Sequence, residues 1–164
     1  MAADRVPGAS GGPVRPAVAL AFATIGFVAL TIFGLGMVSL ATEEDVIATP
    51  GLGQVPGIVG VILAVLAFAG GLWASIGRGG RTPSFWGVAW TTAGCFLAYL
   101  GGVWFGVLTT GAGLAVAAGV AGRLATSWFG AVVAGAAFVS AWAGIALVRT
   151  RAHRPRWPWE DPDV

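Results

Sequence analysis

Charged residues divide the chain into stretches that are long, uncharged and mostly apolar. A helix needs about 20 apolar residues to cross the hydrocarbon core of a bilayer, and each stretch exceeds that length. The pattern therefore predicts membrane-spanning helices. The uncharged stretches hold 27 residues between Arg15 and Glu43, 32 between Asp45 and Arg78, 41 between Arg81 and Arg123, and 25 between Arg123 and Arg149.

The first, second and fourth stretches each contain one predicted span. In the second, proline suits the first turn of a helix, so the span begins at Pro56. The third stretch has room for two minimal spans, or for one span and a loop. Its residues 111–122 would reach only about 18 Å as a helix, too short to cross, so we predict one span and an apolar loop on or in the membrane. The predicted spans are residues 17–41, 56–76, 85–108 and 127–148.

The distribution of arginine predicts the orientation of these spans. With four spans and a cytoplasmic N-terminus, eight arginines lie inside and only Arg123 lies outside, as the positive-inside rule requires. A fifth span would move the arginine-rich C-terminal tail outside. We therefore predict an all-α integral membrane protein whose four transmembrane helices form an antiparallel bundle with both termini in the cytoplasm.

The N-terminal region allows two interpretations of the first span. Ser39-Leu40-Ala41 has the small residues of a signal-peptide cleavage site. The apolar segment of about 25 residues is, however, longer than the roughly 7–15 residues of a signal-peptide core, which favours an uncleaved signal-anchor helix. Residues 1–16 are rich in Gly, Pro and Ala and are predicted to form a disordered cytoplasmic tail.

Composition mainly excludes classes of function. Hydrophobic residues make up 57% of the chain and charged residues 10%, with a mean hydropathy of +0.84, whereas soluble domains carry about 25% charged residues. The net charge of +2 is too small to suggest nucleic-acid binding. The single cysteine, Cys95, excludes an intrachain disulfide and a cysteine-cluster metal site.

The third span carries small residues at four-residue spacing. Helices in lipid associate through close backbone contact at such residues. We predict that this stripe packs against another helix of the same bundle. The alternative is an interface with a second copy of the chain or with another membrane protein. The residues of the predicted packing stripe are Gly94, Ala98, Gly102 and Gly106.

The predicted spans contain no acidic, basic or histidine side chain. This weighs against a proton-coupled transporter and against a hydrolase with an intramembrane acid–base pair. The acidic residues 43–45 follow the first span, and we interpret them, with Thr42 as N-cap, as the start of a helix. Arg123 either pairs with them or is solvated. We expect no metal ion, no cofactor and no enzymatic activity.

The C-terminal tail, residues 149–164, combines basic and aromatic side chains. Each arginine beside a span gains about 1 kcal/mol from anionic lipid, and the interspersed prolines favour an extended chain with its indoles at the interface. We predict a cytoplasmic membrane anchor; the alternative is a motif that docks a cytoplasmic partner. The residues with this role are Arg149, Arg151, Arg154, Arg156, Trp157 and Trp159.

Residues 154–160, Arg-Pro-Arg-Trp-Pro-Trp-Glu, occur here together with a four-helix layout. In both respects the chain resembles small membrane proteins of actinobacteria that form a family of unknown function. The resemblance implies a bacterial inner-membrane protein and carries no catalytic residue across. In outline the chain also resembles four-span export pumps, but those keep a membrane carboxylate that this chain lacks.

Together these features predict a non-enzymatic multi-pass protein of the bacterial plasma membrane, serving as an accessory or interaction subunit. Its expected partners are the lipid bilayer and either a second copy of the chain or another membrane protein. The alternative is a small transporter or channel component for a neutral solute. An enzyme acting on lipid is disfavoured because no nucleophile–base pair is visible. A transport path would be lined by Thr24, Thr31, Thr91, Thr92, Tyr99 and Ser140.

Overall fold

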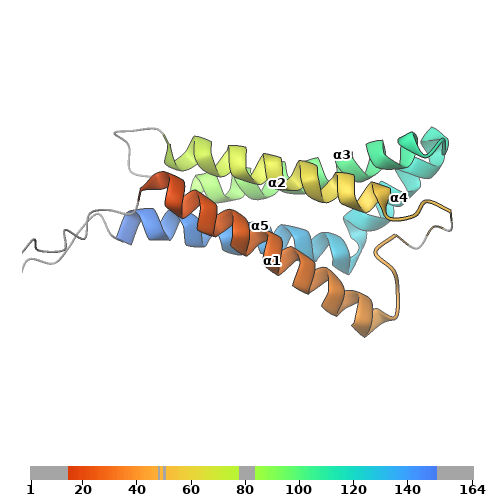
Figure 1. The fold of residues 1–164 in the computed structure, drawn as a ribbon, viewed down its shortest axis with the longest axis horizontal. Helices are drawn as coiled ribbons and strands as arrows, with labels where there is room; N and C mark the ends of the chain where they lie inside the picture. The colour runs from red at the N-terminus through yellow and green to blue at the C-terminus, as the bar shows by residue number, and fades with distance from the viewer. Residues whose placement is uncertain (1–14, 48, 50, 78–83, 151–164) are drawn as a thin grey trace, which may run out of the picture.

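The structure is a computed structural model that describes residues 15–47, 49, 51–77 and 84–150. Within these ranges every regular element is a helix, which confirms the all-α prediction. The helices follow one another in the order drawn in Figure 1. They are α1 (Pro16–Thr42), α2 (Val55–Ile76), α3 (Trp86–Thr109), α4 (Leu114–Thr126) and α5 (Trp128–Thr150).

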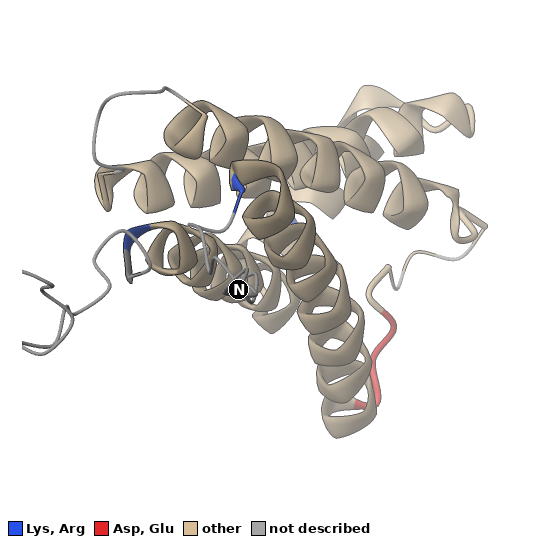
Figure 2. Cartoon of the chain, turned by 60° about the vertical axis from the view of Figure 1, so that its left-hand side comes forward, with Lys and Arg blue, Asp and Glu red and all other residues tan. Residues whose placement is uncertain are grey.

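Four of the described helices, α1, α2, α3 and α5, are long and apolar enough to cross a membrane. They lie over the four predicted ranges, and their ends differ from the predicted ends by no more than two residues. Successive long helices run in opposite directions along the bundle (Figure 1). We call the end where α1 begins and α5 ends the termini end, and the end where Glu43–Asp45 follow α1 the acidic end (Figure 2).

Residues 111–122, for which the sequence predicts an apolar loop, belong largely to a helix. Residues 111–122 are too few to cross a membrane, but they are enough to form most of the 13-residue helix α4. Leucine and alanine favour helix, and α4 buries Ala117, Val120 and Leu124 while it packs against α3 and α5. Gly111, with φ of +84°, turns the chain between α3 and α4 in a conformation that glycine adopts without steric cost.

Helix α1 packs mainly against α5 and contacts α2 over a smaller area. Near the middle of the bundle, Phe27 of α1 stacks on Phe68 of α2 with ring centroids 4.7 Å apart and ring planes at 12°. Both side chains are buried. Toward the acidic end α1 diverges from α2, as Figures 1 and 2 show. The two helices are therefore joined at their centre and separate beyond it.

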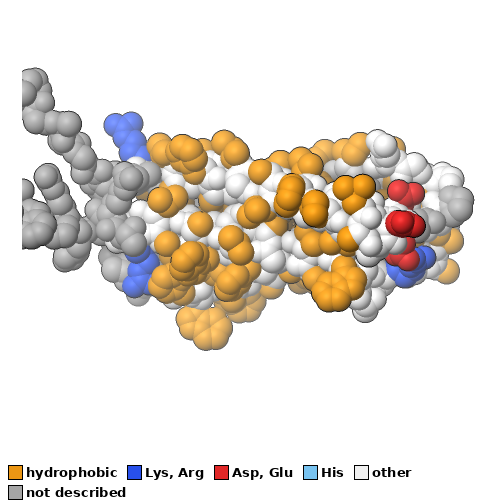
Figure 3. All heavy atoms as spheres, turned by 90° about the horizontal axis from the view of Figure 1, so that it is seen from below, with side chains coloured by type: hydrophobic (Ala, Val, Ile, Leu, Met, Phe, Trp, Pro, Cys, Tyr) orange, Lys and Arg blue, Asp and Glu red, His pale blue; other side chains and the backbone are white. Residues whose placement is uncertain are grey.

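The side chains on the outside of the bundle are sorted by polarity along its length. Figure 3 shows hydrophobic side chains over the middle of one face and charged side chains at the two ends. Each charged side chain in the described ranges is exposed. Large apolar side chains are exposed too, including Phe22, Phe33 and Leu66. A contiguous apolar surface of this kind is costly in water and suits contact with lipid.

Candidate functional site

The predicted packing stripe of α3 is divided between two environments. A Cβ atom added at Gly102 would lie 2.7 Å from the Cα of Gly60, and one added at Gly106 would lie 2.6 Å from the Cα of Pro56. Both positions require glycine because the backbone of α2 occupies the space that a side chain would fill. This half of the stripe accordingly lies in the contact between α2 and α3, the most extensive one between helices.

The other half of the stripe faces outward. A Cβ added at Gly94 would meet no atom of the described structure within 4 Å, and Ala98 is only partly buried. Gly101, beside the stripe, is exposed and equally open. The intramolecular packing expected for the whole stripe therefore involves Gly102 and Gly106, whereas Gly94 and Gly101 leave a smooth surface on the outside of α3.

Among the predicted interface residues, only Arg149 lies in the described part of the chain. Its guanidinium carbon lies 4.6 Å from the ring centroid of Phe85, a cation–π contact. The contact joins the end of α5 to the start of α3 at the termini end. The other residues of this predicted set lie outside the described residues: Arg151, Arg154, Arg156, Trp157 and Trp159.

The acidic residues after the first span do not begin a helix. Thr42 is the last residue of α1, and its hydroxyl donates a hydrogen bond to the carbonyl of Val38 at 2.8 Å. Glu43 follows as C-cap with φ of 54°. The predicted N-cap role of Thr42 is therefore wrong, because the helix continues through the point at which the sequence suggested that a new one starts.

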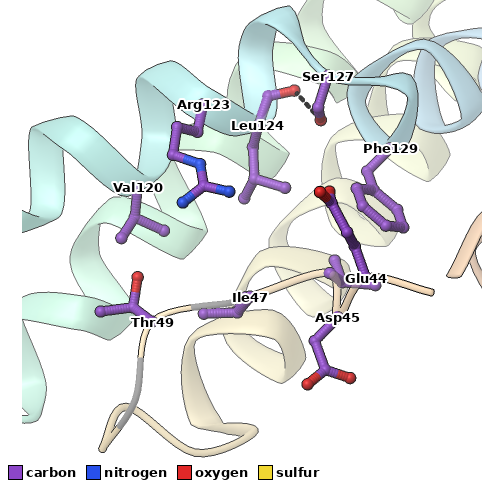
Figure 4. Close-up of a pocket in the computed structure, with 10 residues that line it drawn as sticks. Glu44, Asp45, Ile47, Thr49, Val120, Arg123, Leu124, Ser127 and Phe129 are labelled. Atoms are coloured by element: carbon purple, nitrogen blue, oxygen red, sulfur yellow. Dashed lines mark hydrogen bonds between the residues drawn. The ribbon is translucent and has the colours of Figure 1, made fainter. Parts of the chain in front are cut away.

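A small pocket of about 50 Å³ lies at the acidic end, between residues 44–47 and 49 on one side and α4 with the start of α5 on the other. Glu44 and Arg123 both line it, and Figure 4 shows the two side chains directed toward the same space with no bond drawn between them. Asp45 also lines the pocket, but its carboxylate is directed away from Arg123. The structure thus brings Arg123 close to the acidic residues without forming an ion pair among these described groups.

A larger apolar groove separates α1 from α2 toward the acidic end. Its volume is about 640 Å³, within the range of about 300–1,000 Å³ that is usual for ligand sites. Aliphatic side chains form its walls, including Leu35 of α1 and Val61 of α2, and Tyr99 of α3 lines it from behind. We call it the α1–α2 groove. Its full lining is Leu35, Ser39, Asp45, Val46, Ile47, Gly53, Gln54, Gly57, Ile58, Val61, Ile62 and Tyr99.

Sequence reasoning missed this groove because it depends on the direction of α1 after its contact with α2. Each lining segment is an ordinary apolar helix or a short loop in the sequence. The signal that was present, turn residues close to Pro56, marks the start of α2 but not the distance between α2 and α1. Hydrophobic periodicity indicates which residues form a helix, but it does not indicate the angle between that helix and its neighbour.

The residues expected to line a transport path are distributed over the interior of the bundle. Gly71 of α2 packs against Thr91 of α3, and Gly26 of α1 faces Ser140 of α5. Five of the six expected hydroxyls are buried without a hydrogen-bond partner in the described structure. The sixth, Tyr99, lines the α1–α2 groove. The five unpaired hydroxyls belong to Thr24, Thr31, Thr91, Thr92 and Ser140.

The thiol of Cys95 lies in the middle of the bundle, away from the acidic residues at its end. Among the described residues, no three His, Cys, Asp or Glu side chains are grouped so that they could hold a metal ion. Cys95 is fully buried, and its thiol donates to the carbonyl of Ala64 at 3.4 Å. This contact joins α2 to α3 in the middle of the bundle. Cys95 therefore acts as a small packing residue.

Comparison with protein families gives one finding. Residues 14–164 match a family described as a family of unknown function, DUF6121. Comparison with curated proteins gives no match, and comparison with solved structures gives none either. The resemblance to an uncharacterised family is confirmed, while the actinobacterial origin stays a prediction. With nearly all of its length matched, from residue 14 to its last residue, the chain belongs to the DUF6121 family of unknown function.

Proposed function

We propose that the protein is a non-enzymatic multi-pass protein of the bacterial plasma membrane and acts as an accessory or interaction subunit. The observation that carries this proposal is the open surface of α3 around Gly94 and Gly101, where an added Cβ would meet nothing within 4 Å. A second copy of the chain, or a helix of another membrane protein, can approach closely at such small residues.

The surroundings of these glycines support the same proposal. Trp90 and Leu97, on the same exposed side of α3, are large and 75% and 66% exposed. Large side chains beside glycine give a helix both a groove and the apolar projections that fill a partner's groove. The described charged side chains lie at the two ends of the bundle, away from this surface.

Affinity purification of the full chain in mild detergent tests the proposal. Two differently tagged copies are expressed together, so that self-association and other companions are both detected. The replacements Gly94→Leu and Gly101→Leu, made together, should release the companion because side chains now occupy the surface. Gly135→Leu on α5, another glycine with open space around it, is the matched control and should retain the companion.

A parallel variant that lacks residues 155–164 separates the α3 surface from the predicted docking motif of the tail. Release of the companion by the α3 replacements, with retention in the control, supports the proposal. Recovery of a lone monomer from the unaltered chain contradicts it. So does a companion that remains bound in the α3 variant and in the tail deletion alike.

The unpaired hydroxyls favour a second candidate function, a transporter or channel component for a neutral solute. A buried hydroxyl without a partner is costly, and such groups commonly serve a ligand or an ordered water. Reconstitution into vesicles tests this function by measuring solute flux. Flux that falls when Thr31 and Thr91 are both replaced by valine supports it. Flux equal to that of empty vesicles contradicts it.

A further inference from the structure

The α1–α2 groove is amphipathic along its length. Leu35, Val61 and Ile62 line it within the bundle, and Ser39, Asp45 and Gln54 lie where it opens at the acidic end. Val61 lies seven positions after Gln54, the N-cap of α2, which is about 10 Å along the helix at a rise of 1.5 Å per residue. The groove therefore has an apolar interior of that depth below a polar mouth, which matches a ligand with a polar head and an apolar chain.

The mouth of the groove carries negative charge. Asp45 lines it directly, and the neighbouring residues Glu43 and Glu44 add to the same local charge. The Ser39 hydroxyl already donates to the carbonyl of Glu44 at 2.8 Å. The carboxylate of Asp45 and the amide of Gln54 remain for a ligand. An ammonium group complements this mouth, whereas a headgroup with only negative charge is repelled.

Tyr99 provides a second polar contact deeper in the groove. Its side chain is 1% exposed, and its hydroxyl makes no hydrogen bond to any described residue. A buried phenol ordinarily has a partner. An acceptor on a groove ligand would complete this arrangement. In a phospholipid, the ester carbonyls lie between the headgroup and the acyl chains, which is the order in which the groove presents its polar and apolar groups.

We propose that the α1–α2 groove binds one amine-bearing phospholipid, of the phosphatidylethanolamine type, from the leaflet at the acidic end. The ammonium group pairs with the carboxylate of Asp45, and an ester carbonyl accepts a hydrogen bond from Tyr99. One acyl chain lies along Leu35, Val61 and Ile62. The inference rests on the membrane location in the proposed function, but it is independent of any protein partner at Gly94 and Gly101.

The adjoining charged pocket supports a zwitterionic headgroup. Asp45, Val46 and Ile47 line both the groove and the pocket that holds Arg123. The only described cation at this end of the bundle therefore lies across a short loop from the mouth. The phosphate of such a headgroup is attracted to Arg123, which shares its pocket with Glu44, while the ammonium is attracted to Asp45.

Native mass spectrometry of the full chain tests the proposal. The protein is extracted from bilayers that contain equal amounts of phosphatidylethanolamine and phosphatidylglycerol, and the retained lipid is identified. The unaltered chain should retain one phosphatidylethanolamine. Gly57→Leu should abolish retention by filling the groove, since a Cβ there makes only an ordinary contact of 3.6 Å with Ile47. Gly70→Leu, in open space on the same helix, is the matched control.

Two further variants separate the polar contacts. Asp45→Asn should lower the preference for phosphatidylethanolamine by roughly two- to fivefold, as expected for an exposed ion pair. Tyr99→Phe should lower retention of both lipids without changing the preference. Neither lipid depends on the companion tested above, so a lone monomer that retains phosphatidylethanolamine contradicts the proposed function and supports this inference.

Three results overturn the inference. The first is equal retention of the two lipids by the unaltered chain, and the second is retention that persists in Gly57→Leu. The third is a crosslink to another polypeptide when a photo-crosslinking residue replaces Ile58, which lines the groove. That product would mean that a polypeptide occupies the groove in place of a lipid.

Discussion

Neighbouring glycines of α3 have opposite packing environments. Gly102 is pressed against α2, where the Cα of Gly60 and the carbonyl oxygen of Val59 lie within 2.7 and 3.0 Å of an added Cβ. Gly101 has open space around it. Four-residue spacing predicted a contact surface on α3, but spacing alone does not tell which side of a small residue faces the bundle. The sequence therefore indicates where small residues follow one another on α3, but not which of them contact α2.

Replacing Gly102 by alanine should destabilise the protein, because backbone atoms occupy the space of the new methyl group. The expected loss in the free energy of unfolding is about 1–3 kcal/mol, typical of an overpacked core. Gly101→Ala is the control and should cause no loss, since alanine is the better helix former. Reversible unfolding in mixed micelles, followed by helical circular dichroism, compares them. Equal stabilities for the two variants would show that α2 and α3 do not approach this closely.

Thr31→Val should leave stability unchanged or raise it by about 1 kcal/mol, since the replacement removes a buried hydroxyl that lacks a partner. Thr109→Val is the control. The Thr109 hydroxyl donates to the carbonyl of Gly106 at 2.7 Å, so that replacement should be neutral or unfavourable. The same unfolding measurement checks both variants. A marked loss of stability in Thr31→Val would indicate that its hydroxyl has a partner in the membrane.

At the scale of elements, the four long helices were predictable because each is specified by its own sequence. A run of apolar residues longer than a bilayer crossing is visible without knowledge of its neighbours. α4 was not predicted as a helix because its 13 residues are too few for that test, and its burial depends on α3 and α5. The α1–α2 groove was missed for the same reason, since it results from the direction of one helix relative to another.

We expect the stacking of Phe27 on Phe68 to fix the position of α1 relative to α2. Phe27 is 1% exposed, so Phe27→Ala should cost about 3–5 kcal/mol, the usual range for a buried phenylalanine. Phe33→Ala changes a side chain of the same helix that is 67% exposed and should cost much less. Distances between spin labels on α1 and α2 check the outcome, with a broader distribution expected only in Phe27→Ala. Broadening in both variants would contradict this role of the stacked pair.

In the whole molecule, the described charged side chains lie at the two ends of the bundle that the packing of the long helices defines. Arg15 and Arg149 lie at the termini end, and Arg123 lies near Glu44 at the acidic end (Figure 4). The sequence predicted this separation because charged side chains are costly in the middle of a membrane span but not at its ends. It did not predict how the two ends differ in shape, with a cation–π contact at one and an open groove at the other.

We propose that the four long helices span the membrane with the acidic end of the bundle outside the cell and the termini end in the cytoplasm. Labelling of introduced cysteines with a membrane-impermeant maleimide tests it most directly. Thr42 and Ser84 are exposed at the acidic end and the termini end, and the native Cys95 is fully buried. Thr42→Cys should be labelled in intact cells, Ser84→Cys only after permeabilisation, and Cys95 in neither. Labelling of both introduced cysteines in intact cells, or of Ser84→Cys alone, would contradict this orientation.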